Sequence, residues 1–344
     1  MRVDEAGHDE AAARVELLRA LVHAEACDVA VDDRDVRLEP LAGEDGQDPA
    51  AAHHELGGLV SACHGEPSRE IRHGNDHIPS QYACPVEVLT PRTLDEALAL
   101  KAERPDAVPI QGGTDVMVEL NFDRARPPAL LNLNEVPELR GWSRGNGTLR
   151  IASGLTYSEA MTLAQPLGAL AEASRTVGGP QIRNRGTVGG NLGTASPAGD
   201  ALPPLLVYGA EVELASTRGE RPVPLHEFLR GPRRNALEPD ELIVALRIPV
   251  PGPRQTFMKV GPRNAMVIAV VSLALIVDED ELRASFGSAG PVAGLVRAPL
   301  GERDSFAELV AEAASPIDDV RGTARYRRHA LRVLTERALE RCLA

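Results

Sequence analysis

The stretch at residues 178–200 constrains the fold of this chain more than any other. Its sequence, GGPQIRNRGTVGGNLGTASPAGD, contains seven glycines and only three sizeable aliphatic side chains, Ile182, Val188 and Leu192. Glycine lets another group come within contact of the main chain, where a Cβ would block it. The stretch therefore predicts a place where the backbone closely approaches a ligand or another part of the chain.

A second glycine segment, QGGTD, lies earlier at residues 111–115. It follows a short apolar run and precedes a helical pattern, so it predicts a tight turn between a strand and a helix. Such a turn can be a plain connection. Successive N–H groups in a glycine-rich turn can also form a nest that binds an anion, and residues 187–191 (TVGGN) offer a second nest. Two separated nests suit a long diphosphate ligand between two lobes.

The spacing of these glycines and the composition of the chain argue against several classes of function. Neither segment has the G-x-G-x-x-G or G-x₄-G-K-[ST] spacing of nucleotide-binding loops, and FAD is the cofactor that fits the remainder. The net charge of −13 argues against a nucleic-acid surface. The longest apolar run, residues 265–277, is shorter than the roughly 20 residues of a membrane span and predicts a buried strand.

The first 81 residues differ in composition from the rest of the chain. They contain 18 Asp and Glu against 7 Arg, and seven of the nine histidines. This break predicts a boundary and an acidic, disordered extension, or a start assigned too far upstream. The four cysteines, Cys27, Cys63, Cys84 and Cys342, show no metal-site or disulfide spacing. That pattern is typical of a reduced, cytoplasmic setting.

Periodicity and chain breakers predict the elements of the remaining chain. Strands are expected at residues 86–89, 108–110, 129–133, 148–154, 210–216, 241–249, 255–260, 265–277 and 281–288. Helices are expected at residues 94–103, 157–164, 168–176, 202–208 and 324–343, the first opened by a capping box at Thr93 and Glu96.

The segment GGPQIRNRGTVGGNLGTASPAGDALPPLLVYGAEVEL resembles the glycine-rich core of the FAD-binding medium subunit of the molybdenum hydroxylases, the xanthine dehydrogenase and carbon monoxide dehydrogenase family. The resemblance extends over residues 86–344 and includes IQGGTDVMVEL, LEPDELIVALRIP, MKVGPRNAMVIAVVSLAL, FGSAGP and ASPIDDVRGTARYRRHAL. Several motifs in the same order make it more specific than any single motif.

The resemblance implies an α+β fold: a two-lobed PCMH-type FAD-binding region at residues 82–254, followed by a C-terminal domain at residues 255–344 with a three-stranded antiparallel sheet and helices. The sequence departs from the family pattern at Gln111, where alanine is usual, and in a shorter segment at residues 297–315.

The resemblance also implies which residues hold non-covalent FAD. Asp200 matches an acidic residue that contacts the cofactor, Lys259 a lysine near the flavin ring, and Ile243 an aliphatic position beside it. From the residues alone, Asp200 could instead cap the following helix, and Ile243 could be a core residue of a strand. The complete set is Pro109, Ile110, Gln111, Gly112, Gly113, Thr114, Asp115, Val116, Thr187, Val188, Gly189, Gly190, Asn191, Asp200, Ile243 and Lys259.

The partners implied by the resemblance are a molybdopterin-binding large subunit and a small subunit with two [2Fe-2S] clusters, in a heterotrimer that can itself dimerise. The chain would take electrons from the clusters and pass them to an acceptor such as NAD, oxygen or a quinone. No catalytic acid, base or metal ligand is expected. Two alternatives stay open: a self-contained FAD-dependent oxidase or reductase of the vanillyl-alcohol-oxidase-like superfamily, and a degenerate scaffold subunit without FAD.

Overall fold

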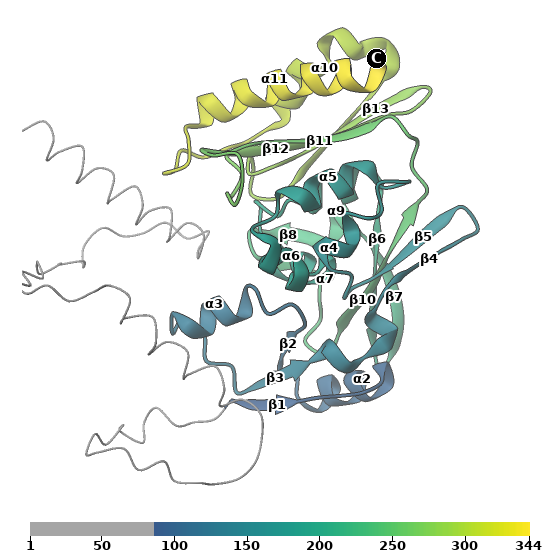
Figure 1. Ribbon diagram of the computed structural model, residues 1–344, viewed down its shortest axis with the longest axis vertical. Helices are drawn as coiled ribbons and strands as arrows, with labels where there is room; N and C mark the ends of the chain where they lie inside the picture. The colour runs from purple at the N-terminus through teal and green to yellow at the C-terminus, as the bar shows by residue number, and fades with distance from the viewer. Residues whose placement is uncertain (1–85) are drawn as a thin grey trace, which may run out of the picture. The chain divides into compact units, whose positions relative to one another are not determined.

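In the computed structural model of the protein, the described residues are Val86–Ala344. The expected acidic extension at residues 1–81 lies outside them. The described chain begins with a small parallel sheet of order β1-β3-β2 (Figure 1). Its strands are β1 (Glu87–Leu89), β2 (Val108–Ile110) and β3 (Ala129–Asn132), and its helices are α2 (Leu94–Glu103) and α3 (Val116–Asn121), with 3₁₀ turns η5 (Leu133–Glu135) and η6 (Pro137–Leu139) after β3.

The start of α2 follows the prediction from sequence. The Thr93 hydroxyl accepts a hydrogen bond from the Glu96 N–H at 3.2 Å, which satisfies one of the N–H groups left free in the first helical turn. The Glu96 carboxylate accepts from the N–H of Arg92 instead of Thr93. The capping box is therefore only half formed.

A five-stranded antiparallel sheet of order β4-β5-β10-β6-β7 forms the middle of the described chain. Its strands are β4 (Trp142–Gly145), β5 (Thr148–Ala152), β6 (Glu211–Ser216), β7 (Gly219–Pro224) and β10 (Leu242–Pro249), and a short ribbon of β8 (Leu229–Gly231) and β9 (Arg234–Asn235) precedes β10. Six helices accompany it: α4 (Tyr157–Ala160), α5 (Gly168–Thr176), α6 (Pro180–Arg185), α7 (Val188–Thr194), α8 (Leu202–Val207) and α9 (Leu225–Phe228). The glycine-rich stretch thus contains two short helices, α6 and α7.

The last sheet is antiparallel and has the order β11-β12-β13-β14. Its strands are β11 (Gln255–Val260), β12 (Val271–Val277), β13 (Glu281–Gly287) and β14 (Gly294–Pro299), followed by η7 (Leu300–Glu302), α10 (Arg303–Ala313) and α11 (Ala324–Leu343). The expected α+β architecture of several sheets and helices is confirmed. The expected count of three strands in this sheet is wrong, because β14 pairs with β13 along six residues.

The two faces of this sheet pack against different partners. The alternate residues Val271, Leu273 and Leu275 face the core formed with α10 and α11, whereas Ala274 and Ile276 belong to the core shared with α5 and α8. Figure 1 shows α10 and α11 on one side of β11–β13 and α5 on the other. Burial on both faces explains why β12 reads as a continuous apolar run.

Strand β10 contributes to two different cores because its ladder contains a β-bulge. Its pairing with β6 shifts register between Ile243 and Ala245. Before the shift, Leu242 and Val244 belong to the core that includes α2 and β3, whereas after it Leu246 and Ile248 belong to the core that includes α5 and α8. An extra residue reverses which face the following side chains occupy.

The apolar run at residues 265–277 is not one strand, which corrects the sequence prediction. Only its second half forms β12, and Met266 adopts a left-handed φ of 49° in the preceding loop. The carbonyls of Ala265 and Met266 accept hydrogen bonds from the Arg263 guanidinium. Because hydrophobicity alone does not distinguish a strand from the wall of a cavity, the pattern could not reveal this break.

Candidate functional site

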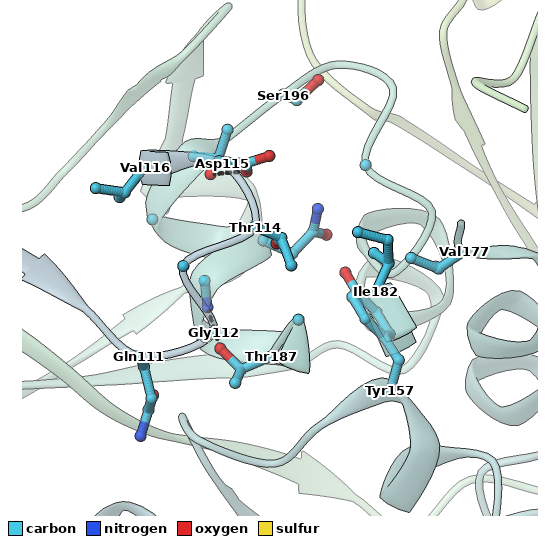
Figure 2. A pocket seen from close by; sticks show the side chains of 18 of the residues that line it. Gln111, Gly112, Thr114, Asp115, Val116, Tyr157, Val177, Ile182, Thr187 and Ser196 are labelled. Carbon is cyan, nitrogen blue, oxygen red and sulfur yellow. Dashed lines mark hydrogen bonds between the residues drawn. The ribbon is translucent and has the colours of Figure 1, made fainter. Parts of the chain in front are cut away.

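The structure brings the two glycine segments into contact. A Cβ on Gly112 would lie 2.4 Å from the carbonyl oxygen of Arg185, so only glycine allows the two backbones to approach this closely. The side chains also meet, because the Thr194 hydroxyl donates to the Asp115 carboxylate at 2.6 Å. The turn after β2 thus contacts the end of α6 and the end of α7, which are more than 70 residues away in sequence, and these segments form one wall (Figure 2).

A cavity of about 670 Å³ opens where these segments meet. Its volume lies within the roughly 300–1,000 Å³ that is usual for ligand and cofactor sites. The lining comes from the turn after β2, from the segment between β5 and α8, from the start of β10, and from the loop before β12. The cavity is therefore built jointly by all three sheets and their connections.

The N–H groups of the two glycine segments differ in their availability. Within the described part of the chain, the backbone N–H groups of Gly112, Gly113 and Thr114 have no hydrogen-bond acceptor, and Gly113 has a left-handed φ of 75°. In the second segment, the Gly189 N–H donates to the Ser153 carbonyl at 2.8 Å and the Gly190 N–H to the Thr187 hydroxyl at 2.9 Å.

Of the two segments, both within the described residues, the first alone presents a run of free N–H groups, so the second does not form the nest predicted from sequence. In the second segment the amides secure α7 to β5 and to its own N-terminal cap. A Cβ on Gly189 would lie 2.5 Å from the Cβ of Ser153, whereas Gly190 is exposed to the cavity. Glycine at position 189 thus allows α7 to pack closely against Ser153.

Buried polar atoms without partners border the cavity. Asn191 Oδ1, Asp200 Oδ1 and Ser153 Oγ have no hydrogen-bond partner among the described residues, and all three residues line the cavity. Buried polar groups are nearly always hydrogen-bonded in folded proteins, so a group of unsatisfied atoms at one cavity indicates a missing ligand or water. Two of these atoms are acceptors only, which matches a ligand that carries hydrogen-bond donors as well as an anionic group.

Asp200 forms a buried ion pair with Lys259. Their atoms Oδ2 and Nζ are 2.6 Å apart, and each side chain is only 7% exposed. Lys259 also donates to the Thr176 carbonyl at 3.3 Å. Burial raises the pKa of the Asp200 carboxyl, while the charge and hydrogen bond of Lys259 oppose that rise. Asp200 does not cap α8, whose N-cap residue is Ala201, so the alternative role considered from sequence is wrong.

Gln111 contributes its backbone to the cavity wall, but its side chain points away (Figure 2). The amide packs against Gly154, where a Cβ would lie 2.3 Å from Gln111 Nε2. The departure from alanine at this position therefore places a polar group behind the turn and leaves the face toward the cavity unchanged. Gln111 Nε2 is buried without a partner there.

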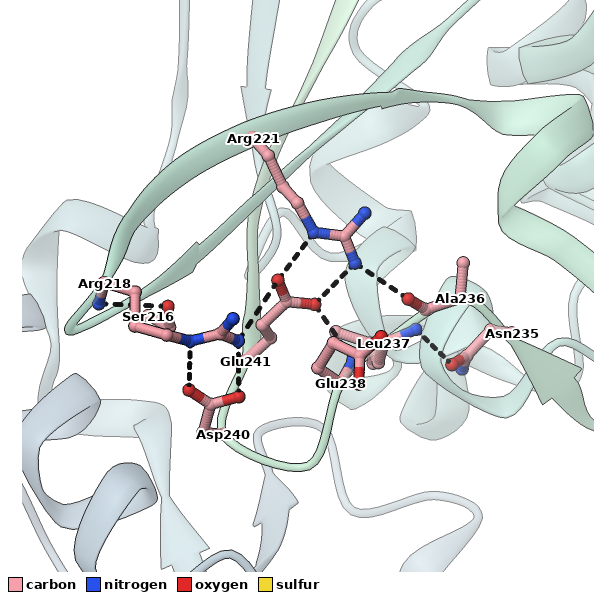
Figure 3. A network of polar contacts seen from close by, with 9 residues as sticks. All are labelled: Ser216, Arg218, Arg221, Asn235, Ala236, Leu237, Glu238, Asp240 and Glu241. Atoms are coloured by element: carbon pink, nitrogen blue, oxygen red, sulfur yellow. Dashed lines mark hydrogen bonds and ion pairs between the residues drawn. The ribbon is translucent and has the colours of Figure 1, made fainter.

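An ion-pair network fixes the segment that enters β10 (Figure 3). Arg221 donates to both carboxylate oxygens of Glu241 at 2.6 and 2.7 Å, and Arg218 pairs with Asp240 at 2.7 Å. Burial opposes ionisation of Glu241, but the hydrogen bonds and charge of Arg221 hold the pKa of Glu241 below its usual value. The network secures Glu241 and Leu237 where they line the cavity.

Fourteen of the sixteen residues predicted from sequence line this cavity. Val188 lies in the core at 0% exposure, and Lys259 reaches the site only through Asp200. Ile243 both packs against the core and lines the cavity. Sequence reasoning missed the remaining wall, which includes Ser153, Tyr157, Val177, Ile182, Ser196, Leu237, Met266, Val267 and Ile268.

Among these missed residues, only Tyr157 had a signal in the sequence, and that signal was a local capping pattern. Tyr157 lies within the capping-box sequence Thr156-x-x-Glu159, directly after the N-cap of a short helix, and the chain contains only four tyrosines. Residues 86–344 contain no group of three or more His, Cys, Asp or Glu side chains that could hold a metal ion. None of the helices described has the length and apolar character needed to cross a membrane.

Comparison with known protein families identifies one matching family. Residues 84–251 match the family described as the FAD binding domain in molybdopterin dehydrogenase. The putative xanthine dehydrogenase FAD-binding subunit of Escherichia coli K12 is 32% identical over 275 residues, which cover 73% of this chain and 94% of that protein. The nicotinate dehydrogenase FAD-subunit of Eubacterium barkeri is 34% identical over 205 residues, covering 57% of this chain and 69% of that one.

Two solved structures of oxidoreductases contain chains with a similar fold. A chain of carbon monoxide dehydrogenase from Hydrogenophaga pseudoflava superposes with a TM-score of 0.70 at 25% identity, covering 75% of this chain and 97% of that chain. A chain of quinoline 2-oxidoreductase from Pseudomonas putida 86 gives a TM-score of 0.70 at 26% identity with the same coverage. The family match at residues 84–251 includes all the segments that line the cavity except the loop at residues 266–268.

Proposed function

Because the chain belongs to the family of FAD-binding subunits of molybdenum hydroxylases, we propose that it is the electron-transfer subunit of such an oxidoreductase. It accepts electrons from the [2Fe-2S] clusters of a small subunit, which receive them from a molybdopterin-binding large subunit. It passes them to an external acceptor such as NAD, oxygen or a quinone. The three subunits assemble as a heterotrimer that can itself dimerise.

The observation that carries this proposal is the cavity between the two glycine segments. It combines free N–H groups at Gly112, Gly113 and Thr114 with unpartnered oxygens on Asn191 and Asp200. FAD presents both an anionic diphosphate and hydroxyl donors, so the chemistry of the lining fits this cofactor. The residues predicted from sequence are accordingly proposed as its binding site, with Val188 and Lys259 acting behind the wall.

Each part of the lining has a distinct task toward the cofactor. The N–H groups at residues 112–114 stabilise the diphosphate through the partial charges of the backbone, without a charged side chain. Asp200, held by Lys259, accepts a hydrogen bond through its free oxygen. Ile243 and the loop at residues 266–268 provide apolar wall and exclude water. When bound, FAD supplies the exchange between one-electron and two-electron steps, and the protein supplies binding and orientation.

We also propose that the division of the chain follows this function, with residues 82–254 as the FAD-binding part and residues 255–344 as a C-terminal domain. The boundary falls between β10 and β11. The C-terminal sheet builds its own core with α10 and α11, which supports this division. The loop before β12 nevertheless lines the cavity, so the C-terminal part contributes to cofactor binding.

The two alternatives considered from sequence have less support. A self-contained oxidase would need a substrate site of its own, and the family of the chain consists of subunits that work within larger enzymes. A scaffold without FAD would have no reason to keep unsatisfied Asn191 and Asp200 oxygens beside an open cavity. The flavin content separates the proposed function from the scaffold, and the subunits that copurify with the chain separate it from the self-contained oxidase.

The test uses the complex purified through a tag on this chain. We expect large and small subunits to copurify, an absorption band of flavin near roughly 450 nm, and release of FAD on heating. Gly113→Val, which places a branched side chain at a left-handed φ, should yield a complex without FAD. In that complex the reducing substrate should still bleach the iron–sulfur absorbance, while reduction of the external acceptor is lost. Undiminished reduction of the acceptor without flavin would refute the proposed position of FAD in the electron path.

A further inference from the structure

Among residues 86–344, Tyr157 is the one aromatic residue that lines the cavity, and neither the sequence motifs nor the family match assigned it a task. We propose that the Tyr157 hydroxyl donates a hydrogen bond to bound FAD and thereby contributes to cofactor affinity. The inference rests on the proposed function of the cavity as the FAD site. It goes beyond that function by naming a specific donor outside both glycine segments.

The backbone around Tyr157 holds the ring in one place. Tyr157 is the first residue of α4, whose capping box is complete: the Thr156 hydroxyl accepts from the Glu159 N–H at 3.2 Å, and the Glu159 carboxylate accepts from the Thr156 N–H at 2.7 Å. The Tyr157 N–H donates to the Gly186 carbonyl at 3.0 Å. A Cβ on Gly186 would lie 3.2 Å from the ring, so the ring packs directly on the backbone just before α7.

This placement directs the phenol into the cavity. Figure 2 shows the Tyr157 side chain beside Val177 and Ile182, across from the turn that carries Thr114. The residue is only 5% exposed. Within residues 86–344, its hydroxyl has no hydrogen-bond partner. The hydroxyl keeps accessible surface on the cavity side, where a ligand can reach it.

Tyr208 shows the usual arrangement in the same protein. It is 2% exposed, and its hydroxyl donates to Gln255 Oε1 at 2.6 Å and accepts from the Leu170 N–H at 3.0 Å. The two tyrosines thus have similar burial and opposite hydrogen-bond status. The difference is that Tyr157 faces the cavity, so its missing partner is expected to come from a ligand.

The electrostatic surroundings keep Tyr157 in the form that can donate. Burial raises the pKa of Tyr157, and the nearby carboxylates of Asp200 and Asp115 raise it further. The phenol therefore stays protonated at physiological pH and donates without adding a charge to the cavity. FAD offers acceptors to such a donor in its phosphate oxygens, its ring carbonyls and its ring nitrogens.

The experiment compares Tyr157→Phe with Tyr208→Phe in the full chain, each measured without and with FAD. Thermal unfolding without FAD reports on hydrogen bonds inside the protein, and a fluorescence titration with FAD reports on affinity. For Tyr157→Phe we expect an unchanged unfolding midpoint and an FAD dissociation constant raised by about three- to tenfold, the loss of one hydrogen bond. For Tyr208→Phe we expect a lower unfolding midpoint and an unchanged dissociation constant below that midpoint.

The possible results separate this inference from the proposed function. If the unaltered chain and its complex bind no FAD, the proposed function fails, and the inference fails with it. If the unaltered chain binds FAD and Tyr157→Phe binds it equally well, only the inference is overturned. A Tyr157→Phe chain that unfolds earlier than the unaltered chain in the absence of FAD, or that does not fold, also overturns it, because the hydroxyl would then have a partner inside the protein.

Discussion

Replacing Gly189 with alanine should destabilise the fold, although the residue belongs to a motif that sequence reasoning assigned to ligand binding. An added Cβ would lie 2.5 Å from Ser153 Cβ and 2.6 Å from the Ser153 carbonyl oxygen. Ser153 cannot easily move, because its own N–H donates to the Val244 carbonyl at 2.8 Å and its carbonyl accepts from the Gly189 N–H at 2.8 Å. To relieve the clash, α7 and the end of β5 must separate by on the order of an ångström.

The expected change in the free energy of unfolding combines two costs and one gain. Overpacking of this kind costs about 1–3 kcal/mol, and weakening of the hydrogen bond between Gly189 and Ser153 adds about 1 kcal/mol. The higher helix propensity of alanine returns up to about 1 kcal/mol. The expected net loss is about 2 kcal/mol, or a fall of about 4–8 °C in the unfolding midpoint of a domain of this size.

Gly193→Ala is the matched control in the same helix. Its added Cβ would meet only Ile243 Cδ1, at 3.9 Å, which is an ordinary contact. That variant should therefore keep or gain stability, by up to about 1 kcal/mol. Thermal and urea unfolding of both variants without FAD measures the difference. Equal stability of Gly189→Ala and the unaltered chain, or an equal loss in both variants, would refute the packing argument.

Three further outcomes follow from other parts of the structure. Lys259→Met should lower the free energy of unfolding by about 3–5 kcal/mol, because it leaves Asp200 buried and unpaired, and adding Asp200→Asn should restore part of that loss in urea unfolding. Because the pKa of Glu241 is lowered in the folded protein, the free energy of unfolding should fall as the pH drops below about 4.5, where the unfolded chain takes up the proton first. Glu241→Gln should make the free energy of unfolding depend less on pH between pH 6 and 3. An unchanged pH dependence in that variant would contradict the lowered pKa of Glu241. Burial raises the pKa of the Cys342 thiol to about 11, so the number of thiols that a disulfide reagent labels rapidly at pH 7 should be the same in Cys342→Ala as in the unaltered chain.

Local patterns in the sequence predicted the long elements well. The helix at residues 94–103 and the helix at residues 324–343 have the expected bounds, because their caps and apolar periodicity depend on near neighbours in the chain. The positions of β5, β6 and β11 were also predicted within one or two residues. Each of these strands carries a clear apolar or alternating run between breakers.

The parts that sequence did not predict depend on contacts between distant residues. Glycine at positions 112 and 189 was recognised as significant, but the pattern could not tell that one approaches Arg185 and the other Ser153. The apolar residues before β12 looked like strand because a cavity wall and a strand need the same side chains. Tyr157 was missed because a hydroxyl without a partner is visible only when the surrounding groups are in place.

The bulge in β10 ties the length of this strand to the organisation of the protein. Because of the register shift after Ile243, Leu242 and Leu246 pack into different cores, so this one strand contributes to two hydrophobic interiors. The strand lines the cavity next to this shift. Replacing Leu246 or Ile248 with another aliphatic residue would leave this arrangement intact. Gain or loss of a single residue at the bulge would instead send every later side chain of the strand to the opposite interior. The number of residues at the bulge, more than the choice among aliphatic side chains after it, therefore determines which interior each later side chain of β10 enters.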